Sequence, residues 1–202
     1  MLAAAGVVWI VAHSYNVTFK EWGLFGNLCV AFCVGMTILI GGLAAGVING
    51  VVLTFSALAA LFDLGEEIAS DAPDVEGDAL RSATSLTMRK GSLYALRLAG
   101  GIFGICIALS LLPFVTGWPG QVYLLLIGMT DLCMAYFTIP LVESTSRIEG
   151  HELVRRLYLA WGAFMMVVIA GMTRGSSSFR AIADMPGGKV RTTFTDMPCC
   201  LQ

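Results

Sequence analysis

The chain has 202 residues, of which 57% are apolar and 13% charged, and its formal net charge is −2. A soluble domain carries roughly 25% charged residues, so this chain has too few to cover a compact globule with polar surface. This composition excludes an ordinary soluble enzyme and a disordered chain. The small negative net charge excludes a nucleic-acid binder. The sequence therefore predicts an all-α fold, a multi-spanning transmembrane helical bundle.

The apolar stretches predict five full membrane spans and one partial span. A helix needs about 20 mostly apolar residues to cross the bilayer core. The first 11 apolar residues, 2–12, make only half a span, and we expect them to end a helix whose beginning is missing. Residues 1–173 thus form the predicted bundle, and 174–202 a polar, loosely ordered tail. The full spans are predicted at 23–45, 47–62, 92–113, 121–142 and 156–173, with a break at 46–50.

The predicted loops differ in charge between the two ends of the bundle. Loops 13–22, 63–91 and 143–155 carry the basic residues, whereas those near 46 and at 114–120 carry none. The positive-inside rule places the basic loops in the cytoplasm. The tail after 173 falls on the other side and contradicts this rule with four basic residues, but it is one segment against three. We therefore expect a multi-pass membrane protein whose acidic loop lies on the cytoplasmic side.

An acidic segment follows the second predicted span. Residues 63–78 contain seven of the 14 acidic residues of the chain. Two carboxylates 4 Å apart repel by about 4 kcal/mol at an effective dielectric of 20, so such a cluster needs a counter-ion or raised pKa values. Carboxylate oxygens suit Mg²⁺ or Ca²⁺. A solvated acidic loop is the alternative, but solvated helix faces usually mix both signs of charge. Five acids share one helical face, at intervals of four, four, three and four: Asp63, Glu67, Asp71, Asp74 and Asp78.

At this segment the sequence resembles the UbiA superfamily of intramembrane prenyltransferases, and above all its archaeal ether-lipid branch. The family pattern Arg-Glu-Ile-x-Lys-Asp-x-x-Asp-x-x-Gly-Asp stands here as Glu66-Glu67-Ile68-Ala69-Ser70-Asp71-Ala72-Pro73-Asp74-Val75-Glu76-Gly77-Asp78. Glu66 and Ser70 thus stand where the family pattern has Arg and Lys. The stretch 15–20 resembles the family loop between helices four and five, and 23–28 the start of helix five. The first family motif, Asn-x-x-x-Asp-x-x-x-Asp, is absent, so the chain resembles the second half of a nine-helix fold.

The resemblance implies a reaction and a set of residue roles. A prenyl group, geranylgeranyl as first choice, would move from its diphosphate to a lipid or aromatic acceptor with Mg²⁺, the first-choice acceptor being a geranylgeranylglycerol phosphate. A chain with half of the metal site is expected to be weakly active or inactive alone, and a missing N-terminal half and membrane lipids would be its partners. The catalytic residues would be Asp71, Asp74, Asp78 and Lys20, the metal ligands Glu67, Asp71, Asp74 and Asp78, and the substrate contacts Tyr15, Lys20, Asn27, Arg81 and Asp131.

Several polar residues have more than one interpretation. Asp131 lies within a predicted span, where a carboxylate is costly. It can contact substrate or hydrogen-bond to a neighbouring helix. Arg81 can contact the diphosphate or pair with Asp78. Asn27 and Asn49 are expected to hydrogen-bond between helices.

A non-enzymatic membrane protein, such as a cation-binding transport subunit, is the alternative function. A cation pathway would need acidic residues at several depths of the bundle. The predicted spans contain one acidic residue, Asp131. The seven acidic residues of segment 63–78 instead gather at one surface of the bundle. This distribution favours a diphosphate site.

Overall fold

The computed structural model describes residues 2–46, 48–72, 86–115, 121–144 and 147–173. Throughout these ranges the regular elements are helices, and no strand occurs. The predicted all-α fold is confirmed. Asp74, Asp78 and Arg81 lie outside the described residues, as does the segment 174–202.

The N-terminal part consists of three long helices and one short one: α1 (Leu2–Val17), η1 (Phe19–Glu21), α2 (Leu24–Ala44) and α3 (Gly50–Asp71). The predicted break after the first span is confirmed, and it is made by Gly46 at φ +68°, a conformation that favours glycine. Asn49 caps α3, since its side chain accepts a hydrogen bond from the Val52 N–H at 3.0 Å. The expected bond from Asn49 to another helix stays a prediction, since this cap uses its side-chain oxygen alone.

The C-terminal part consists of α5 (Leu86–Lys90), α6 (Ser92–Ser110), α7 (Leu112–Val115), α8 (Gln121–Glu143) and α9 (Arg147–Thr173). Helix α9 begins well before the predicted start at 156, so much of the predicted loop 143–155 is helical. In its first turns Glu152 pairs with Arg155 at 2.6 Å and Arg156 at 3.0 Å, and Leu153 and Val154 are buried in the core. Pairs three and four residues apart add to the stability of a helix.

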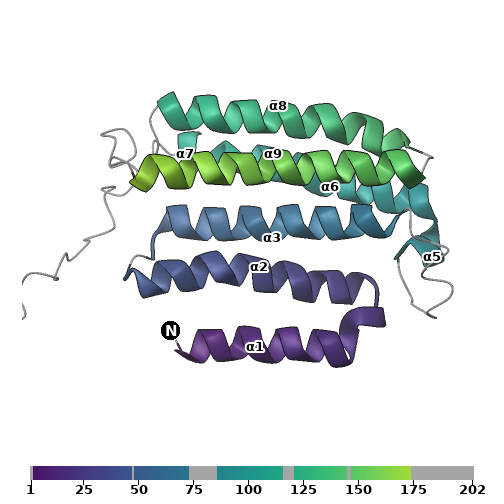
Figure 1. The fold of residues 1–202 in the computed structure, drawn as a ribbon, viewed down its shortest axis with the longest axis horizontal. Coiled ribbons are helices and arrows are strands. Elements are labelled where there is room, and N and C mark those ends of the chain that lie inside the picture. The colour runs from purple at the N-terminus through teal and green to yellow at the C-terminus, as the bar shows by residue number, and fades with distance from the viewer. Residues whose placement is uncertain (1, 47, 73–85, 116–120, 145–146, 174–202) are drawn as a thin grey trace, which may run out of the picture.

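The long helices lie side by side (Figure 1). Helix α1 packs on α2, α2 on α3, and α3 on α6; α8 packs on α6, and α9 packs on α8 and returns to contact α3. Element η1, the C-terminal end of α3, α5 and the start of α9 all lie at the same end of the bundle. Tyr15 near the end of α1, Lys20 in η1, Asn27 near the start of α2, and Glu67 and Asp71 at the end of α3 are the predicted site residues at that end.

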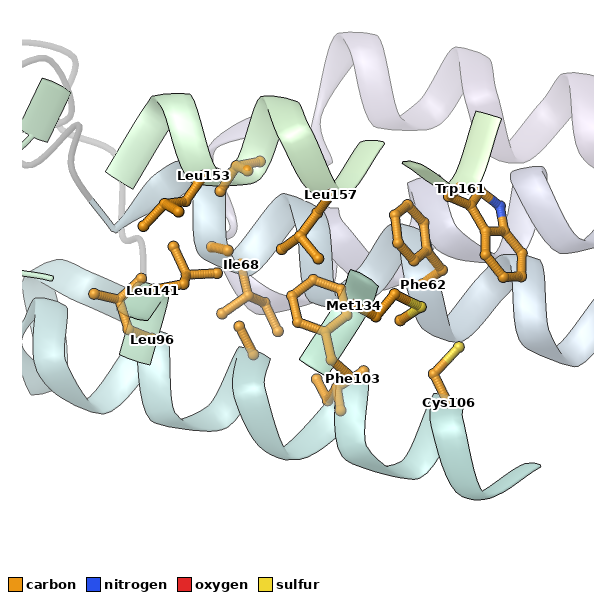
Figure 2. Packing of buried hydrophobic residues seen from close by; sticks show 14 of the residues in the cluster. Phe62, Ile68, Leu96, Phe103, Cys106, Met134, Leu141, Leu153, Leu157 and Trp161 are labelled. Carbon is orange, nitrogen blue, oxygen red and sulfur yellow. The ribbon is translucent and has the colours of Figure 1, made fainter. Parts of the chain in front are cut away.

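The hydrophobic core lies between α3, α6, α8 and α9. Figure 2 shows Phe62 and Ile68 of α3 pointing toward Phe103 of α6, Met134 of α8 and Leu157 of α9. Phe103, Ile68, Met134 and Leu157 are at most 1% exposed. Helices α1 and α2 stay outside this core, and α1 buries none of its side chains.

Three stretches are long and apolar enough to cross a membrane: Leu24–Ala44, Ser92–Val115 and Leu124–Glu143. They correspond to the first, third and fourth predicted spans. The search covered the part of the chain that the structure describes. Helices α3 and α9 carry charged turns beside their apolar turns, so the count of five spans stays a prediction. The apolar N-terminal helix is 16 residues long and extends beyond the predicted 2–12.

Helices α2 and α3 approach closely at Gly35. A Cβ atom there would lie 2.9 Å from both the Ser56 carbonyl oxygen and the Ala60 Cβ. The Ser56 hydroxyl donates to the Gly35 carbonyl oxygen at 2.7 Å. Backbone approach at a small residue with a hydrogen bond beside it is how helices associate in membranes. This contact fixes α2 against α3 and thereby places the N-terminal end of α2 beside the acidic end of α3.

Candidate functional site at the acidic end of α3

The acidic site is built on the last turns of α3. The helix continues past the predicted span end at 62 and ends at Asp71, so Asp63, Glu67 and Asp71 share one helical face as predicted. The opposite face of these turns carries Gly65, Ile68 and Ala69, which are buried. Core packing therefore directs the carboxylates away from the core, toward α2 and α1.

Asn27 of α2 contacts Asp71 directly. The Asn27 side-chain amide donates to Asp71 Oδ2 at 2.9 Å, and Asn27 is 7% exposed. The prediction of an interhelical hydrogen bond at Asn27 is thus confirmed. This hydrogen bond orients the Asp71 carboxylate. Substrate contact at Asn27 stays a prediction.

Tyr15 of α1 lies at the edge of the same acidic face. Partial burial, and then the negative charges of Glu67 and Asp71, raise the pKa of Tyr15. Gly26 allows the start of α2 to pack closely against η1 and the end of α1. A Cβ atom at Gly26 would lie 2.7 Å from the Phe19 carbonyl oxygen and 3.4 Å from the Tyr15 ring. The structure therefore brings Tyr15, Asn27, Glu67 and Asp71 together from three helices.

The carboxylates at this end of α3 are crowded. Burial, followed by the charges of Glu66, Asp63 and Asp71, raises the pKa of Glu67 to about 7. Burial also raises the pKa of Glu66, with smaller contributions from Asp63 and Asp71. Partly buried carboxylates that lie close together are stabilised when a cation binds between them or when one of them takes up a proton. The cluster therefore favours a bound cation or protonation of one of its carboxylates.

Lys20 lies in η1, between α1 and α2. Its side chain is exposed, and its neighbours form an aromatic cluster. The Phe19 ring lies 4.9 Å from Trp22 and 5.0 Å from Phe25, between ring centroids. Amphipathic aromatic side chains gather at membrane interfaces. Because η1 lies at the same end of the bundle as the end of α3, Lys20 lies at the end that carries the acidic face. Its contact with a substrate stays a prediction.

A partial donor set for a metal is present in the described part of the chain. Glu67 and Asp71 provide hard oxygen atoms, and Asp63 Oδ2 is buried without a hydrogen-bond partner in the described residues. No group of three such side chains there is arranged to hold a metal ion. The other two predicted ligands, Asp74 and Asp78, lie outside the described residues. The chemistry of the residues present fits Mg²⁺, with further oxygen ligands needed.

Asp131 lies in the interface between α6 and α8 and is 7% exposed. The Ser110 hydroxyl of α6 donates to Asp131 Oδ2 at 2.7 Å, while Asp131 Oδ1 is buried without a partner among the described residues. The hydrogen bond to a neighbouring helix, one of the two interpretations of Asp131, is therefore present. The contact of Asp131 with a substrate stays a prediction.

Replacing Ser110 with alanine is expected to destabilise the bundle by about 1 kcal/mol, because Asp131 Oδ2 loses its donor inside the bundle. The measurement is the unfolding midpoint in detergent. The double variant Ser110→Ala/Asp131→Leu is expected to recover most of this loss, since no buried carboxylate then lacks a donor. Equal destabilisation by Ser110→Ala in the Asp131→Leu background would contradict this account.

A pocket between α3 and α9 adjoins the acidic face and was not predicted from the sequence. It has a volume of about 330 Å³. One helical face of α9 contributes His151, Arg155, Tyr158 and Leu159, which follow intervals of four, three and one. This spacing was visible in the sequence, but the predicted span at 156–173 left its first residues in a loop. The full lining is Glu66, Ser70, His151, Val154, Arg155, Tyr158 and Leu159.

Known proteins resemble this chain over most of its length. Digeranylgeranylglyceryl phosphate synthase of Methanococcus maripaludis is 29% identical over 163 residues, which are 80% of this chain and 58% of that relative. The enzyme of the same name from Haloquadratum walsbyi is 33% identical over 178 residues, 85% of this chain and 60% of that relative. The chain thus spans less than two thirds of the length of these relatives.

A solved structure has the same fold. It comes from a study of digeranylgeranylglyceryl phosphate synthase in membranes, and the two chains superpose with a TM-score of 0.77 at 24% identity. The superposition covers 90% of this chain and 61% of the other. The sequence also matches the UbiA prenyltransferase family over residues 1–166. With the family pattern matched over most of its length and its acidic end built as described, this chain belongs to the UbiA prenyltransferase family.

Proposed function

We propose that this chain forms the diphosphate-binding half of an intramembrane prenyltransferase of ether-lipid biosynthesis. The donor is a prenyl diphosphate, geranylgeranyl diphosphate as first choice, and the acceptor is a lipid alcohol, geranylgeranylglycerol phosphate as first choice. Transfer forms a bond between the acceptor oxygen and prenyl C1, breaks the bond between C1 and the diphosphate, and releases the hydroxyl proton. The observation that carries the proposal is the one-sided carboxylate face of α3, ordered by Asn27 and bordered by Tyr15.

Mg²⁺ is the cofactor of this proposal. Glu67 and Asp71 would hold it, together with Asp74 and Asp78 from the following segment. A bound Mg²⁺ neutralises the charge that develops on the leaving diphosphate. The chain itself orients one of these ligands through Asn27, and Lys20 and Arg81 would contact the diphosphate. Its exposed apolar helix surfaces can exclude water from a long prenyl tail, which protects a carbocation-like transition state.

The cytoplasmic side is the proposed location of this site. The described parts of the predicted basic loops, η1, the end of α3, α5 and the start of α9, lie at one end of the bundle. The positive-inside rule then gives that end to the cytoplasm. Membrane lipids surround the apolar helices, and a further protein segment carrying the other acidic motif would be a partner of the acidic face.

Binding of a thiolodiphosphate analogue of geranylgeranyl diphosphate tests the proposal. The full chain is placed in phosphatidylcholine nanodiscs, and retention of the labelled analogue is measured with and without Mg²⁺. We expect binding that needs Mg²⁺ and that competes with inorganic diphosphate. Retention that is indifferent to both would reject the diphosphate site. Mg²⁺ flux into liposomes carrying the chain would instead support a transport subunit.

A further inference from the structure

A short polar contact crosses the apolar interior of the bundle between α6 and α8. Asp131 of α8 is 7% exposed, and Ile127 and Met134, on the same helical face, are at most 1% exposed. Asp131 lies near the middle of Leu124–Glu143, a stretch long and apolar enough to cross a membrane. A carboxylate in such a place is costly unless a cation or several donors meet it. The groups around Asp131 therefore decide which form of its carboxyl group the bundle can hold.

No cationic side chain acts on Asp131 in the described part of the chain. Helices α6 and α9 pack against α8. On α6, Cys106 is the titratable group close enough to sense the charge of Asp131, whereas Arg97 lies roughly 20 Å further along the helix. On α9, the charged side chains lie in the first turns, up to Arg156, and Tyr158 lines the pocket with α3. The carboxylates of α3 are directed toward α1 and α2. An ionised Asp131 would thus keep its charge in the interior without a counter-ion.

The polar hydrogens nearest to Asp131 are directed to backbone carbonyl oxygens. The Cys106 thiol donates to the Leu58 carbonyl oxygen at 3.7 Å. The Thr130 hydroxyl donates to the Leu126 carbonyl oxygen at 3.0 Å. Asp131 Oδ1 accordingly has no partner among the described residues. What the carboxyl group has left is its contact at Oδ2.

That contact is with Ser110, which has one hydroxyl hydrogen and two acceptors within reach. Its Oγ lies 2.7 Å from Asp131 Oδ2 and 2.7 Å from the Ile107 carbonyl oxygen. A hydroxyl group donates one hydrogen bond and accepts others. When Ser110 donates to Asp131, the Ile107 oxygen therefore faces a lone pair at hydrogen-bond distance. When the carboxyl group carries a proton, Oδ2 donates to Ser110, Ser110 donates to Ile107, and both short contacts are hydrogen bonds.

We propose that Asp131 is a proton-binding site and that the bundle holds it as a neutral carboxylic acid at neutral pH. Proton uptake from the solvent neutralises the carboxylate at Oδ2 and turns Ser110 from a donor into an acceptor. The Ser110 hydroxyl then donates to the Ile107 carbonyl oxygen. Oδ1 becomes a carbonyl oxygen, and leaving it without a donor costs less than leaving part of a negative charge there.

This proton site is independent of the proposed function, because it uses none of the residues at the acidic end of α3. It does bear on the alternative function, a cation-binding transport subunit. A metal cation passing through the bundle would need the charge of a carboxylate at Asp131, the acidic residue of the predicted spans. A neutral acid gives it no such charge.

The infrared spectrum of the full chain in dodecyl maltoside at neutral pH tests this proposal, since that detergent has no ester carbonyl group. A protonated carboxyl group has a C=O stretching band separate from the bands of a carboxylate. We expect this band in the wild type, its reduction in Asp131→Asn, and its retention in Glu143→Ala, which removes an exposed acid of the same helix. In Ser110→Ala the band is expected to shift to higher frequency, because the acid loses its acceptor. Identical spectra of the wild type and Asp131→Asn in this region would overturn the proposal.

The pH dependence of unfolding in the same detergent gives a second test. The folded bundle holds a proton that the unfolded chain releases to water, so rising pH favours unfolding. Asp131→Asn cannot ionise, and its amide donates to Ser110 as the acid does. From neutral pH upward, the ratio of the unfolding constants, wild type over Asp131→Asn, is expected to rise about tenfold per pH unit, the value for one proton. All other titratable groups are common to both proteins and cancel in this ratio. A ratio that is the same at every pH would show that no proton is held, and would reject the site.

Discussion

Replacing Asp71 with alanine is expected to weaken Mg²⁺-dependent binding of the geranylgeranyl thiolodiphosphate analogue about 100-fold. Asp71 is the carboxylate oriented by Asn27 at 2.9 Å, so its loss removes both a proposed metal ligand and the group that orders the end of α3. Changes in the shell around a metal typically cost 10–100-fold in affinity, and a direct ligand lies at the upper end of that range. Retention in nanodiscs across a Mg²⁺ titration gives the measurement.

Two other variants separate metal binding from folding. Asp71→Asn keeps the size of the side chain and an acceptor for Asn27, and it is expected to lose nearly as much binding because the charge is gone. Glu143→Ala removes an exposed carboxylate of α8, and it is expected to leave binding unchanged. Wild-type affinity in both Asp71 variants would remove this residue from the site.

Replacing Gly35 with leucine is expected to destabilise the chain by about 3 kcal/mol. The Ser56 carbonyl oxygen and the Ala60 Cβ would each lie 2.9 Å from the new Cβ, so α2 and α3 must move apart. Overpacking of a fitted contact typically costs 1–3 kcal/mol, and this one is bounded by backbone. The separation also breaks the hydrogen bond from Ser56 to the Gly35 carbonyl oxygen. Detergent unfolding measures the loss.

Gly41→Leu is the matched control on the same helix. Apart from its chain neighbours and its own helix backbone, no described atom lies within 4 Å of a Cβ built at Gly41, so a leucine there faces open space. We expect its unfolding midpoint to stay near that of the wild type. Gly35→Leu should also weaken prenyl diphosphate binding, because Asn27 of α2 moves with the helix. Stability equal to that of Gly41→Leu would contradict the close contact of α2 with α3.

Much of the acidic face could be predicted because it depends on spacing within one helix. The interval of four between Asp63, Glu67 and Asp71 fixes their common face wherever α3 packs. Asn27 was expected to join two helices, but its partner could not be named, since the sequence gives no register between α2 and α3. That register depends on the close approach at Gly35, which is a property of two helices together.

The α9 wall of the pocket was missed for a different reason. Apolar composition defined the predicted span from 156, whereas the helix begins at Arg147 and its first turns combine charge pairs at Glu152 with the buried Leu153 and Val154. Averaged hydropathy misses such turns because charged residues outnumber these two apolar ones. The opposition of Glu66 to Arg155 further requires the antiparallel contact of α3 with α9, two segments far apart in the sequence.

Helix α1 has a consequence for how ligands reach the acidic face. It carries Tyr15, and none of its side chains is buried. Elements with few buried contacts separate at lower free energy than those in the core. Swinging α1 outward therefore costs less than moving α3, α6 or α9, and it moves Tyr15 away from Glu67 and Asp71. On the proposed function, a prenyl chain arriving from the bilayer would enter along the side of the acidic face that Tyr15 borders.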